Sequence, residues 1–405
     1  MARQGILNGT AALLMWARGL RAFGDGFTAL VLPAYLAGLG FDAFRIGVIT
    51  TITLIGSSML TMAVGLLAHR ARTRTLLIAG CGLMLATGLA FSQWRGFWPL
   101  AVIGFVGTLN PSGGDLSLFL PLEQSLLAHA APDSARTDTF VRFGLVGWAM
   151  LAVGSLFVAV VDVTARALGV DRMDAMRGLF VLYGLLGVAA LSLYLRLPRA
   201  RNEGEPLHTP LGPSRGRVVR LAALFSLDSF GGGFLAQSML ALWLFQRFGL
   251  SLSVAGGFFF WSGLLSGLSQ IVSGRLARRF GLINTMVFTH IPANLCIAAA
   301  AFVPSLAGVI ALLLVRSALS QMDVPARTSY VMAVVTPAER AAAASLTNGP
   351  RSLAGAISPS LAGLLYGAGG FAWPLVIGGG VKIAYDLILL AMFRRIRPPE
   401  ETAAT

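Results

Sequence analysis

The feature that most constrains this chain is a succession of long apolar segments. A helix needs about 20 apolar residues to cross the hydrocarbon core of a bilayer. Twelve runs of about this length or longer lie at 11–38, 43–68, 74–94, 97–129, 137–162, 175–197, 218–247, 252–276, 281–303, 305–335, 340–367 and 372–393. They lack the alternating pattern of the strands in a membrane barrel. The sequence therefore predicts an all-α membrane protein with twelve transmembrane helices.

Composition agrees with lipid as the main solvent. Of the 405 residues, 56% are hydrophobic and 12% are charged, whereas about a quarter of the residues in a soluble domain are charged. The net charge of +14 would suit nucleic acid only if the basic residues gathered on a soluble face. They lie instead at the ends of the apolar runs, so we expect no nucleic-acid partner.

The arginines also predict the topology. If successive spans alternate in direction, the arginine clusters at 70–74, 196–220, 275–279 and 394–397 all fall on one side of the membrane. The opposite loops carry few arginines, with the segment 162–177 as the exception. Because cytoplasmic loops carry an excess of Lys and Arg, we expect a multi-pass protein of the inner (plasma) membrane with both termini in the cytoplasm.

An internal repeat divides the chain. The long polar stretch 198–217 lies near the midpoint and predicts a cytoplasmic linker between an N-terminal half, 1–197, and a C-terminal half, 218–405. Three segments match in order between the halves: 23–27 with 230–234, 65–70 with 274–279, and 121–125 with 325–329. Duplication of this kind is typical of transporters, because two similar halves can rock about a site between them.

Twelve spans in two sets of six, with a Gly-x-Leu-Ala-Asp-Arg-like loop after the second span of each set, resemble the major facilitator superfamily. The matching residues are Gly65, Arg70, Gly274 and Arg279, while His69 and Arg278 stand where the family usually has Asp. The resemblance implies two pseudo-twofold-related six-helix bundles around a central cavity, a small-molecule substrate, a monomer and no cofactor. The proline of the family's drug/proton antiporter signature is absent from span five, so transport is better supported than antiport.

Charges inside the apolar runs point to the candidate site, since a charge at the bilayer centre costs at least about 2.5 to 3.5 kcal/mol. They concentrate in spans one, four, seven and ten, and the family resemblance implies that these spans line the cavity. We expect the substrate and proton cavity to include Asp25, Asn110, Asp115, Asp228, Arg316, Gln321, Asp323 and Arg351.

Two of these acids lie near the middle of their spans. Asp25 and Asp115 are both at mid-span by the rise of a helix, and the segment Asn110–Asp115 holds a proline and two glycines that should break span four. The alternative for Asp25 is that it neutralises Arg21, four residues away on the same helix face.

The resemblance also implies a cytoplasmic latch between Arg70 and Glu123. A second gate follows from the repeat, in which Arg21 aligns with Asp228 and Glu123 with Arg327, so that each aligned pair carries opposite charges. We expect these pairs to bridge the halves when the cytoplasmic side closes. The alternative is that each charge is satisfied within its own half, Arg21 by Asp25 and Glu123 by Arg70. The gating and loop-motif residues are Arg21, Gly65, Arg70, Glu123, Gly274, Arg279 and Arg327.

Two further polar pairs favour structural roles. Lys382 and Asp386 are four residues apart on span twelve and predict a self-neutralised pair facing a neighbouring helix. His290 and Asn294 on span nine predict a satisfied polar pair, because no Cys, Asp or Glu accompanies them as a metal ligand. We expect no metal site.

These observations favour a secondary transporter that exports a small amphipathic or drug-like compound in exchange for protons. An uptake permease or facilitator for a metabolite is the alternative within that class. A membrane receptor, scaffold or lipid scramblase with the same fold is the alternative of another class. The sequence offers no catalytic constellation, so we do not expect an enzyme.

Overall fold

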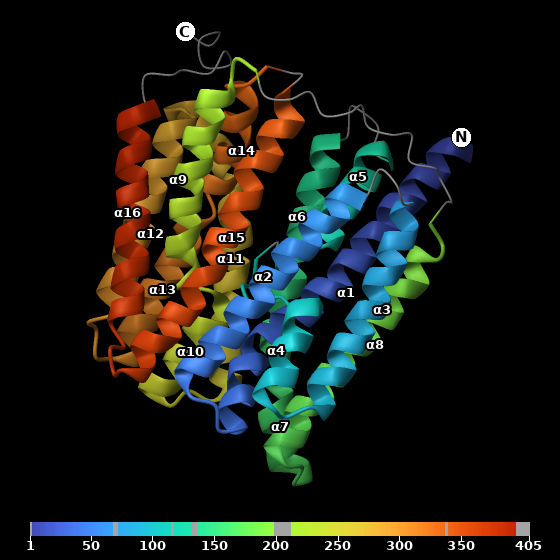
Figure 1. Cartoon of the computed structure of the whole chain (residues 1–405), viewed down its shortest axis with the longest axis vertical. Helices are drawn as coiled ribbons and strands as arrows, with labels where there is room; N and C mark the ends of the chain where they lie inside the picture. The colour runs from blue at the N-terminus through green and yellow to red at the C-terminus, as the bar shows by residue number, and fades with distance from the viewer. Residues whose placement is uncertain are drawn as a thin grey trace. The chain divides into compact units, whose positions relative to one another are not determined.

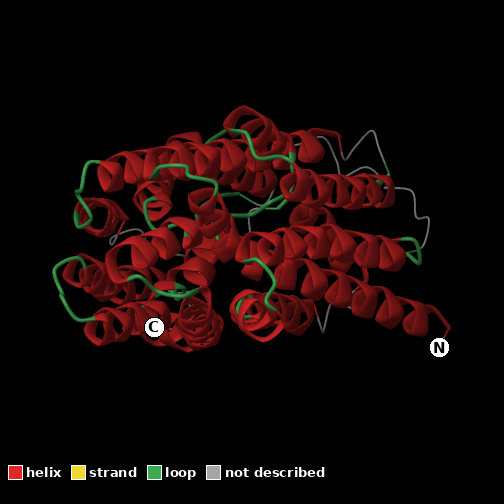
Figure 2. Cartoon of the chain, turned by 90° about the horizontal axis from the view of Figure 1, so that it is seen from below, coloured by secondary structure: helices red, strands yellow, loops and turns green. Residues whose placement is uncertain are grey.

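The structure is a computed structural model. It describes residues 2–67, 72–114, 117–130, 136–197, 212–336 and 339–393. Every regular element in these ranges is a helix, and none is a strand (Figure 2). Nine helical stretches of this described part are long and apolar enough to cross a membrane. The predicted all-helical membrane fold is confirmed.

Sixteen helices fall within or close to the twelve predicted ranges (Figure 1). Ten of them are α1 (Ala2–Gly38), α2 (Ala43–Leu67), α3 (Thr73–Gln93), α6 (Arg136–Phe157), α7 (Val160–Leu168), α8 (Arg172–Tyr194), α11 (Leu252–Phe280), α12 (Leu282–Ala300), α15 (Arg340–Gly367) and α16 (Trp373–Phe393). Glycines with positive φ end several of them. Gly249 (φ 62°) follows the helix that precedes α11, and Gly281 (φ 86°) ends α11 itself.

Three predicted spans are interrupted near their middle. Span four consists of α4 (Phe97–Val106) and α5 (Phe119–Ala130), span seven of α9 (Arg215–Gly233) and α10 (Gln237–Phe248), and span ten of α13 (Leu306–Ser320) and α14 (Asp323–Ala333). The break predicted in span four is therefore confirmed, and those in spans seven and ten are additional. Non-helical backbone at membrane depth is tolerated only where it is buried or lines a cavity.

The chain forms two compact units. Unit 1 comprises 1–205 and 236–260, and unit 2 comprises 206–235 and 261–405. Residues 236–260, expected in the C-terminal half, thus pack with N-terminal helices. Of the predicted linker, only 212–217 lies among the described residues, and α9 already begins at Arg215. The boundary between the predicted halves stays a prediction.

The two units use the same helix pairings. In unit 1, α1 packs against α6 and α8, and α3 packs against α8. In unit 2, α9 packs against α15 and α16, and α12 packs against α16. The first helix of each repeat therefore contacts the fifth and sixth, and the third contacts the sixth.

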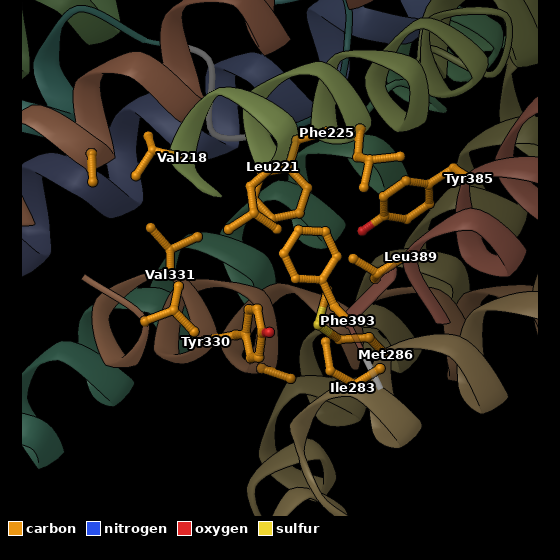
Figure 3. Packing of buried hydrophobic residues seen from close by; sticks show 14 of the residues in the cluster. Val218, Leu221, Phe225, Ile283, Met286, Tyr330, Val331, Tyr385, Leu389 and Phe393 are labelled. Atoms are coloured by element: carbon orange, nitrogen blue, oxygen red, sulfur yellow. The ribbon is translucent and has the colours of Figure 1, made fainter. Parts of the chain in front are cut away.

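Each unit has its own apolar core. In unit 2 it joins α9, α12, α14, α15 and α16, and Figure 3 shows the rings of Phe225, Tyr330, Tyr385 and Phe393 among its aliphatic side chains. Unit 1 buries a comparable cluster around Leu14, whose members come from α1, α2, α3, α5, α6 and α8. Charged side chains lie beside both cores, and they form the candidate site.

Candidate functional site

A buried charge cluster in unit 1 joins the first, fourth and sixth spans. Arg21 on α1 forms an ion pair with Glu123 on α5 through Nη2 and Oε2. Tyr194 on α8 donates its hydroxyl to Glu123 Oε1 at 2.5 Å and accepts from Arg21 Nε at 3.2 Å. The side chain of Glu123 is fully buried. A buried carboxylate is tolerated only when it is paired and hydrogen-bonded, and these two partners meet that requirement.

Arg21 also reaches the break in span four. Its Nη1 donates to Ser117 Oγ at 3.2 Å, and its guanidinium carbon lies 4.2 Å from the ring centroid of Phe119. Ser117 borders a small cavity, whose lining residues are Ser57, Leu60, Gly107, Thr108, Ser117 and Leu118. The arginine therefore connects the ion pair to a residue that lines this small cavity at the broken helix.

Asn110 holds the broken segment in place. Its side-chain oxygen accepts from Ser112 N at 3.2 Å and from Ser112 Oγ at 2.6 Å, while its Nδ2 donates to the Gly114 carbonyl. Local side-chain bonds of this kind give the backbone an alternative to the helix ladder. Asn110 is buried and holds the break by these bonds, and its role in a cavity stays a prediction. Asp115, the acid expected beside it, lies outside the described residues.

The second charge cluster lies in unit 2 and centres on Asp228 of α9. Lys382 Nζ of α16 lies 2.5 Å from Asp228 Oδ1, and Arg327 Nη1 of α14 lies 3.2 Å from Asp228 Oδ2. Arg327 Nη1 also lies 3.2 Å from Asp323, the first residue of α14. One carboxylate therefore holds cations from two other helices.

His290 and Asp386 extend this cluster. His290 Nδ1 on α12 lies 2.9 and 3.0 Å from the two carboxylate oxygens of Asp386 on α16, and Asn294 donates to the same carboxylate at 3.4 Å. The ring's other nitrogen, Nε2, lies 3.9 Å from Asp228 Oδ1. His290 does have an acidic partner, so the expectation that no acid accompanies it was wrong. The acid comes from a different helix.

The pairing expected between Lys382 and Asp386 was also wrong. Lys382 binds Asp228, and Asp386 binds His290 and Asn294. Spacing of four residues puts both side chains on one face of α16, but two other helices, α9 and α12, meet that face and supply separate partners.

The two clusters are related by the repeat, with their charges exchanged. Arg21 corresponds to Asp228, and Glu123 corresponds to Arg327. Unit 1 therefore pairs a cation on its first span with an acid on its fourth, and unit 2 pairs an acid on its first span with a cation on its fourth. Each of these charges has a partner within its own unit. The partner of Arg21 is Glu123, and the pairing expected between Arg21 and Asp25 stays a prediction. The bridges expected between the halves stay a prediction.

The other expected cavity residues are spread over three helices and one helix break. Asp25 is buried on α1, Arg316 and Arg351 are half-buried on α13 and α15, and Gln321 stands at the break between α13 and α14. Their role in a cavity stays a prediction. No group of three metal-ligating side chains is found in the described ranges.

The loop motif lies only in part among the described residues. Arg70 lies outside the described residues, so the latch with Glu123 stays a prediction. Gly65 is exposed near the end of α2, while Gly274 and Arg279 lie on α11. The loop expected at 274–279 was wrong, because the helix continues to Phe280 and ends only at the positive-φ glycine that follows.

Sequence reasoning missed the cluster residues that come from the third and sixth spans of each repeat. Tyr194, His290, Lys382 and Asp386 were given structural roles or no role at all. Each is a polar side chain inside an apolar run. Because a polar side chain inside the membrane is energetically costly, its position alone indicated a partner on another helix.

Comparison with known proteins decides the family. The sequence model of the Major Facilitator Superfamily matches residues 14–322. The chain belongs to this superfamily. The family and the fold together support a multi-pass membrane protein that works as a secondary transporter of small molecules.

Individual relatives are distant. The uncharacterized membrane protein YJR124C of Saccharomyces cerevisiae is 24% identical over 94% of this chain and 93% of its own length. The nucleoside transporter NupG is 14% identical with a TM-score of 0.74, covering 96% of this chain and 99% of its own. A bacterial homologue of the human lysosomal transporter Spinster is 16% identical with a TM-score of 0.73, covering 96% of this chain and 97% of its own. A POT family transporter is 17% identical with a TM-score of 0.72, covering 95% of this chain and 96% of its own.

Proposed function

We propose that the protein exports a small amphipathic or drug-like compound in exchange for protons. It acts as a monomer in the inner (plasma) membrane, with both termini in the cytoplasm. The solute passes along spans one, four, seven and ten, and Asp25, Asp115, Asp228 and Asp323 are the acids that bind the solute or the coupling proton.

The observation that carries the proposal is the coincidence of helix breaks and charges. Spans four, seven and ten are broken, and most of the described charged side chains buried in the units lie on these spans, on span one and on their direct partners; Asp162 and Glu339, near helix ends, are exceptions. Broken helices in transporters mark the solute site, because their free backbone groups need polar surroundings. Acids held in the same spans supply groups that can exchange a proton.

The test is transport by the purified protein in proteoliposomes. A panel of fluorescent or radiolabelled solutes, including cationic amphiphiles, nucleosides and short peptides, is offered with a pH gradient of either sign and with none. We expect a cationic amphiphile to accumulate only when the vesicle lumen is acidic. Nucleosides and peptides are included because two similar folds belong to transporters named for them.

Matched variants tie the result to the site. Asp228→Asn should lose the pH-driven accumulation, since it removes the acid that holds Lys382 and Arg327. Asp174→Asn should retain it, because Asp174 is exposed and, among the described residues, pairs with Arg177 on its own helix. Accumulation driven by the opposite gradient would favour uptake. The proposal of solute transport would be contradicted if no solute of the panel entered faster than into protein-free vesicles while the protein scrambled lipids.

A further inference from the structure

His290 occupies a position that no neutral imidazole satisfies fully. Both of its ring nitrogens face carboxylates, Nδ1 at 2.9 Å from Asp386 and Nε2 at 3.9 Å from Asp228. An ionised carboxylate only accepts hydrogen bonds, and a neutral imidazole has a single N–H to donate. Only an imidazolium, with an N–H on each nitrogen, donates toward both acids.

Burial strengthens this argument. The side chain of His290 is 4% exposed and that of Asp386 is fully buried. The hydrogen-bond partners of Asp386 in the described part of the chain are His290 and Asn294, and neither carries a fixed charge. A buried carboxylate without a charged partner is costly, and one proton on His290 supplies that partner.

The surrounding charges allow the proton to come and go. The titratable groups that lie against His290 are Asp228 on α9, and Tyr385 and Asp386 on α16, while Lys382 on α16 lies against Asp228. Further charges come from α14, with Asp323 and Arg327, and from α15, with Arg351. Around Asp228, the acids Asp228, Asp323 and Asp386 match the cations Arg327, Lys382 and Arg351 in number. The net charge of this group is therefore near zero, and the gain or loss of one proton changes that net charge by one.

We propose that His290, held between Asp386 and Asp228, is a proton-binding site of the C-terminal unit. The bound proton completes an N–H at one ring nitrogen, and its release returns a lone pair to that nitrogen. The protonated ring attracts the carboxylate of Asp228, which also binds Lys382 and Arg327. Proton occupancy thus sets how firmly α9 is held to α14 and α16.

The site belongs to one copy of the repeat. When the halves are aligned through Gly65 and Gly274, position 290 corresponds to Cys81 in the N-terminal unit. Cys81 is buried and free, and a thiol does not carry a positive charge. The repeat is therefore asymmetric in the group that can take up a proton.

This inference rests on the proposed proton coupling, but its first test needs no solute. The chain has four histidines, and replacing the other three by Gln leaves His290 as the single imidazole in the purified full-length protein. With ¹⁵N-labelled histidine, nuclear magnetic resonance at neutral pH should show both ring nitrogens protonated. A neutral ring in this parent protein would overturn the proposal without any change in the cluster itself.

Two variants of the single-histidine protein separate charge from packing. Asp386→Asn should lower the proton affinity of His290 about tenfold or more, the effect that loss of a neighbouring opposite charge has on a buried base. Asn294→Ala removes a neutral partner of the same carboxylate and should leave His290 charged. Equal proton affinity in both variants would overturn the proposal.

Transport supplies the second readout. For a solute that the wild type accumulates, His290→Gln in the otherwise native chain should abolish the acceleration by the pH gradient while solute counterflow continues. Unchanged acceleration would overturn the assignment of His290, even if proton-coupled export holds. A charged His290 in a wild type that ignores the pH gradient would instead contradict the proposed function and leave the proton site standing.

Discussion

At the scale of single residues, Glu123 depends on partners from two other helices. Arg21 and Tyr194 supply its ion pair and its second hydrogen bond in a fully buried position. Removing one member of a buried ion pair leaves the other charge without compensation, which costs more than the pair itself contributes. The cost should therefore fall on folding as well as on transport.

We expect Glu123→Gln to destabilise the protein by about 3–5 kcal/mol, because Arg21 stays charged and loses its counter-ion. Tyr194→Phe removes the hydrogen bond donated to Glu123 and the one accepted from Arg21, and should cost at least about 1.5–3 kcal/mol, the contribution of one hydrogen bond to a charged group. Thermal or SDS-induced unfolding of the purified variants in detergent measures both. A Glu123→Gln variant as stable as wild type would mean that Arg21 finds another acid.

Glu339 offers a pH-dependent contact outside the membrane spans. It precedes α15 and accepts hydrogen bonds from Thr336 Oγ1 at 2.7 Å, Gly212 N at 2.6 Å and Ser214 N at 3.3 Å. The hydrogen bond from Thr336, followed by those from Ser214 and Gly212, lowers the pKa of Glu339 from 4.5 to about 2. Hydrogen bonds to the charged form of an acid favour that form.

The depressed pKa fixes the sign of the pH dependence. A group whose folded pKa is below its unfolded value stabilises the fold above the unfolded pKa, and this contribution is lost as the pH falls. The free energy of unfolding of wild type should therefore exceed that of Glu339→Gln above pH 4.5, and the difference should shrink toward pH 2. Unfolding in detergent across this range measures it. A difference that does not change with pH would show that the charge is immaterial.

At the scale of helices, glycines set how closely the first and fifth spans of each repeat approach. A Cβ added at Gly154 of α6 would lie 2.0 Å from the Phe23 carbonyl oxygen on α1, and one added at Gly233 of α9 would lie 2.1 Å from the Gly355 carbonyl oxygen on α15. Hydroxyls bridge both crossings, from Ser155 to Gly26 and from Ser358 to Phe230. Small residues at such interfaces let helix backbones touch in a membrane.

Gly154→Ala should therefore cost about 1–3 kcal/mol, because the added methyl group meets rigid backbone and must push α1 and α6 apart. Gly82→Ala on α3 is the matched control. An added Cβ there has nothing within 4 Å, and Ala has the higher helix propensity, so this variant should be neutral or slightly more stable. Unfolding of both in detergent compares them, and equal stabilities would contradict close packing at Gly154.

The helices were largely predictable, but of their interruptions only the one in span four was predicted. Pro121 and Pro325 are each the third residue of the helix that follows a break, α5 and α14. A proline lacks an N–H and clashes with the carbonyl four residues earlier, which places the disturbance at Ser117 and Gln321. The sequence contained this signal for span ten, but the two prolines were used only to align the repeat.

Side-chain partners were less predictable than helices, for a geometric reason. Periodicity tells which residues share a face of one helix, and all the wrong pairings joined residues of a single helix. It does not tell which neighbouring helix meets that face. Lys382 and Asp386 share a face of α16, yet they bind residues of α9 and α12 respectively.

At the scale of the whole molecule, residues 236–260 are continuous in sequence with α9 and with the rest of α11 but pack inside unit 1. The amides of Gln237 and Ser238 donate to the carbonyls of Ser112 and Pro111 at 3.2 and 3.1 Å. Asp162 on α7 accepts from Ser253 N at 2.9 Å and Ser253 Oγ at 2.7 Å. These contacts attach the second part of span seven and the start of span eight to the broken segment of span four and to α7.

If transport requires this attachment to open and close, fixing it must stop turnover. Cysteines at Ser112 and Gln237 test this, because paired backbones at hydrogen-bond distance bring the two Cα atoms within the range that a disulfide spans. Cys81 and Cys296, the free cysteines of the described chain, are first replaced by Ser. We expect oxidation to arrest solute transport in proteoliposomes and reduction to restore it, while Gln237→Cys alone is insensitive to oxidant. Full transport with the disulfide formed would mean that 236–260 stays with the N-terminal helices throughout the cycle, and that the solute passes without any separation at Gln237.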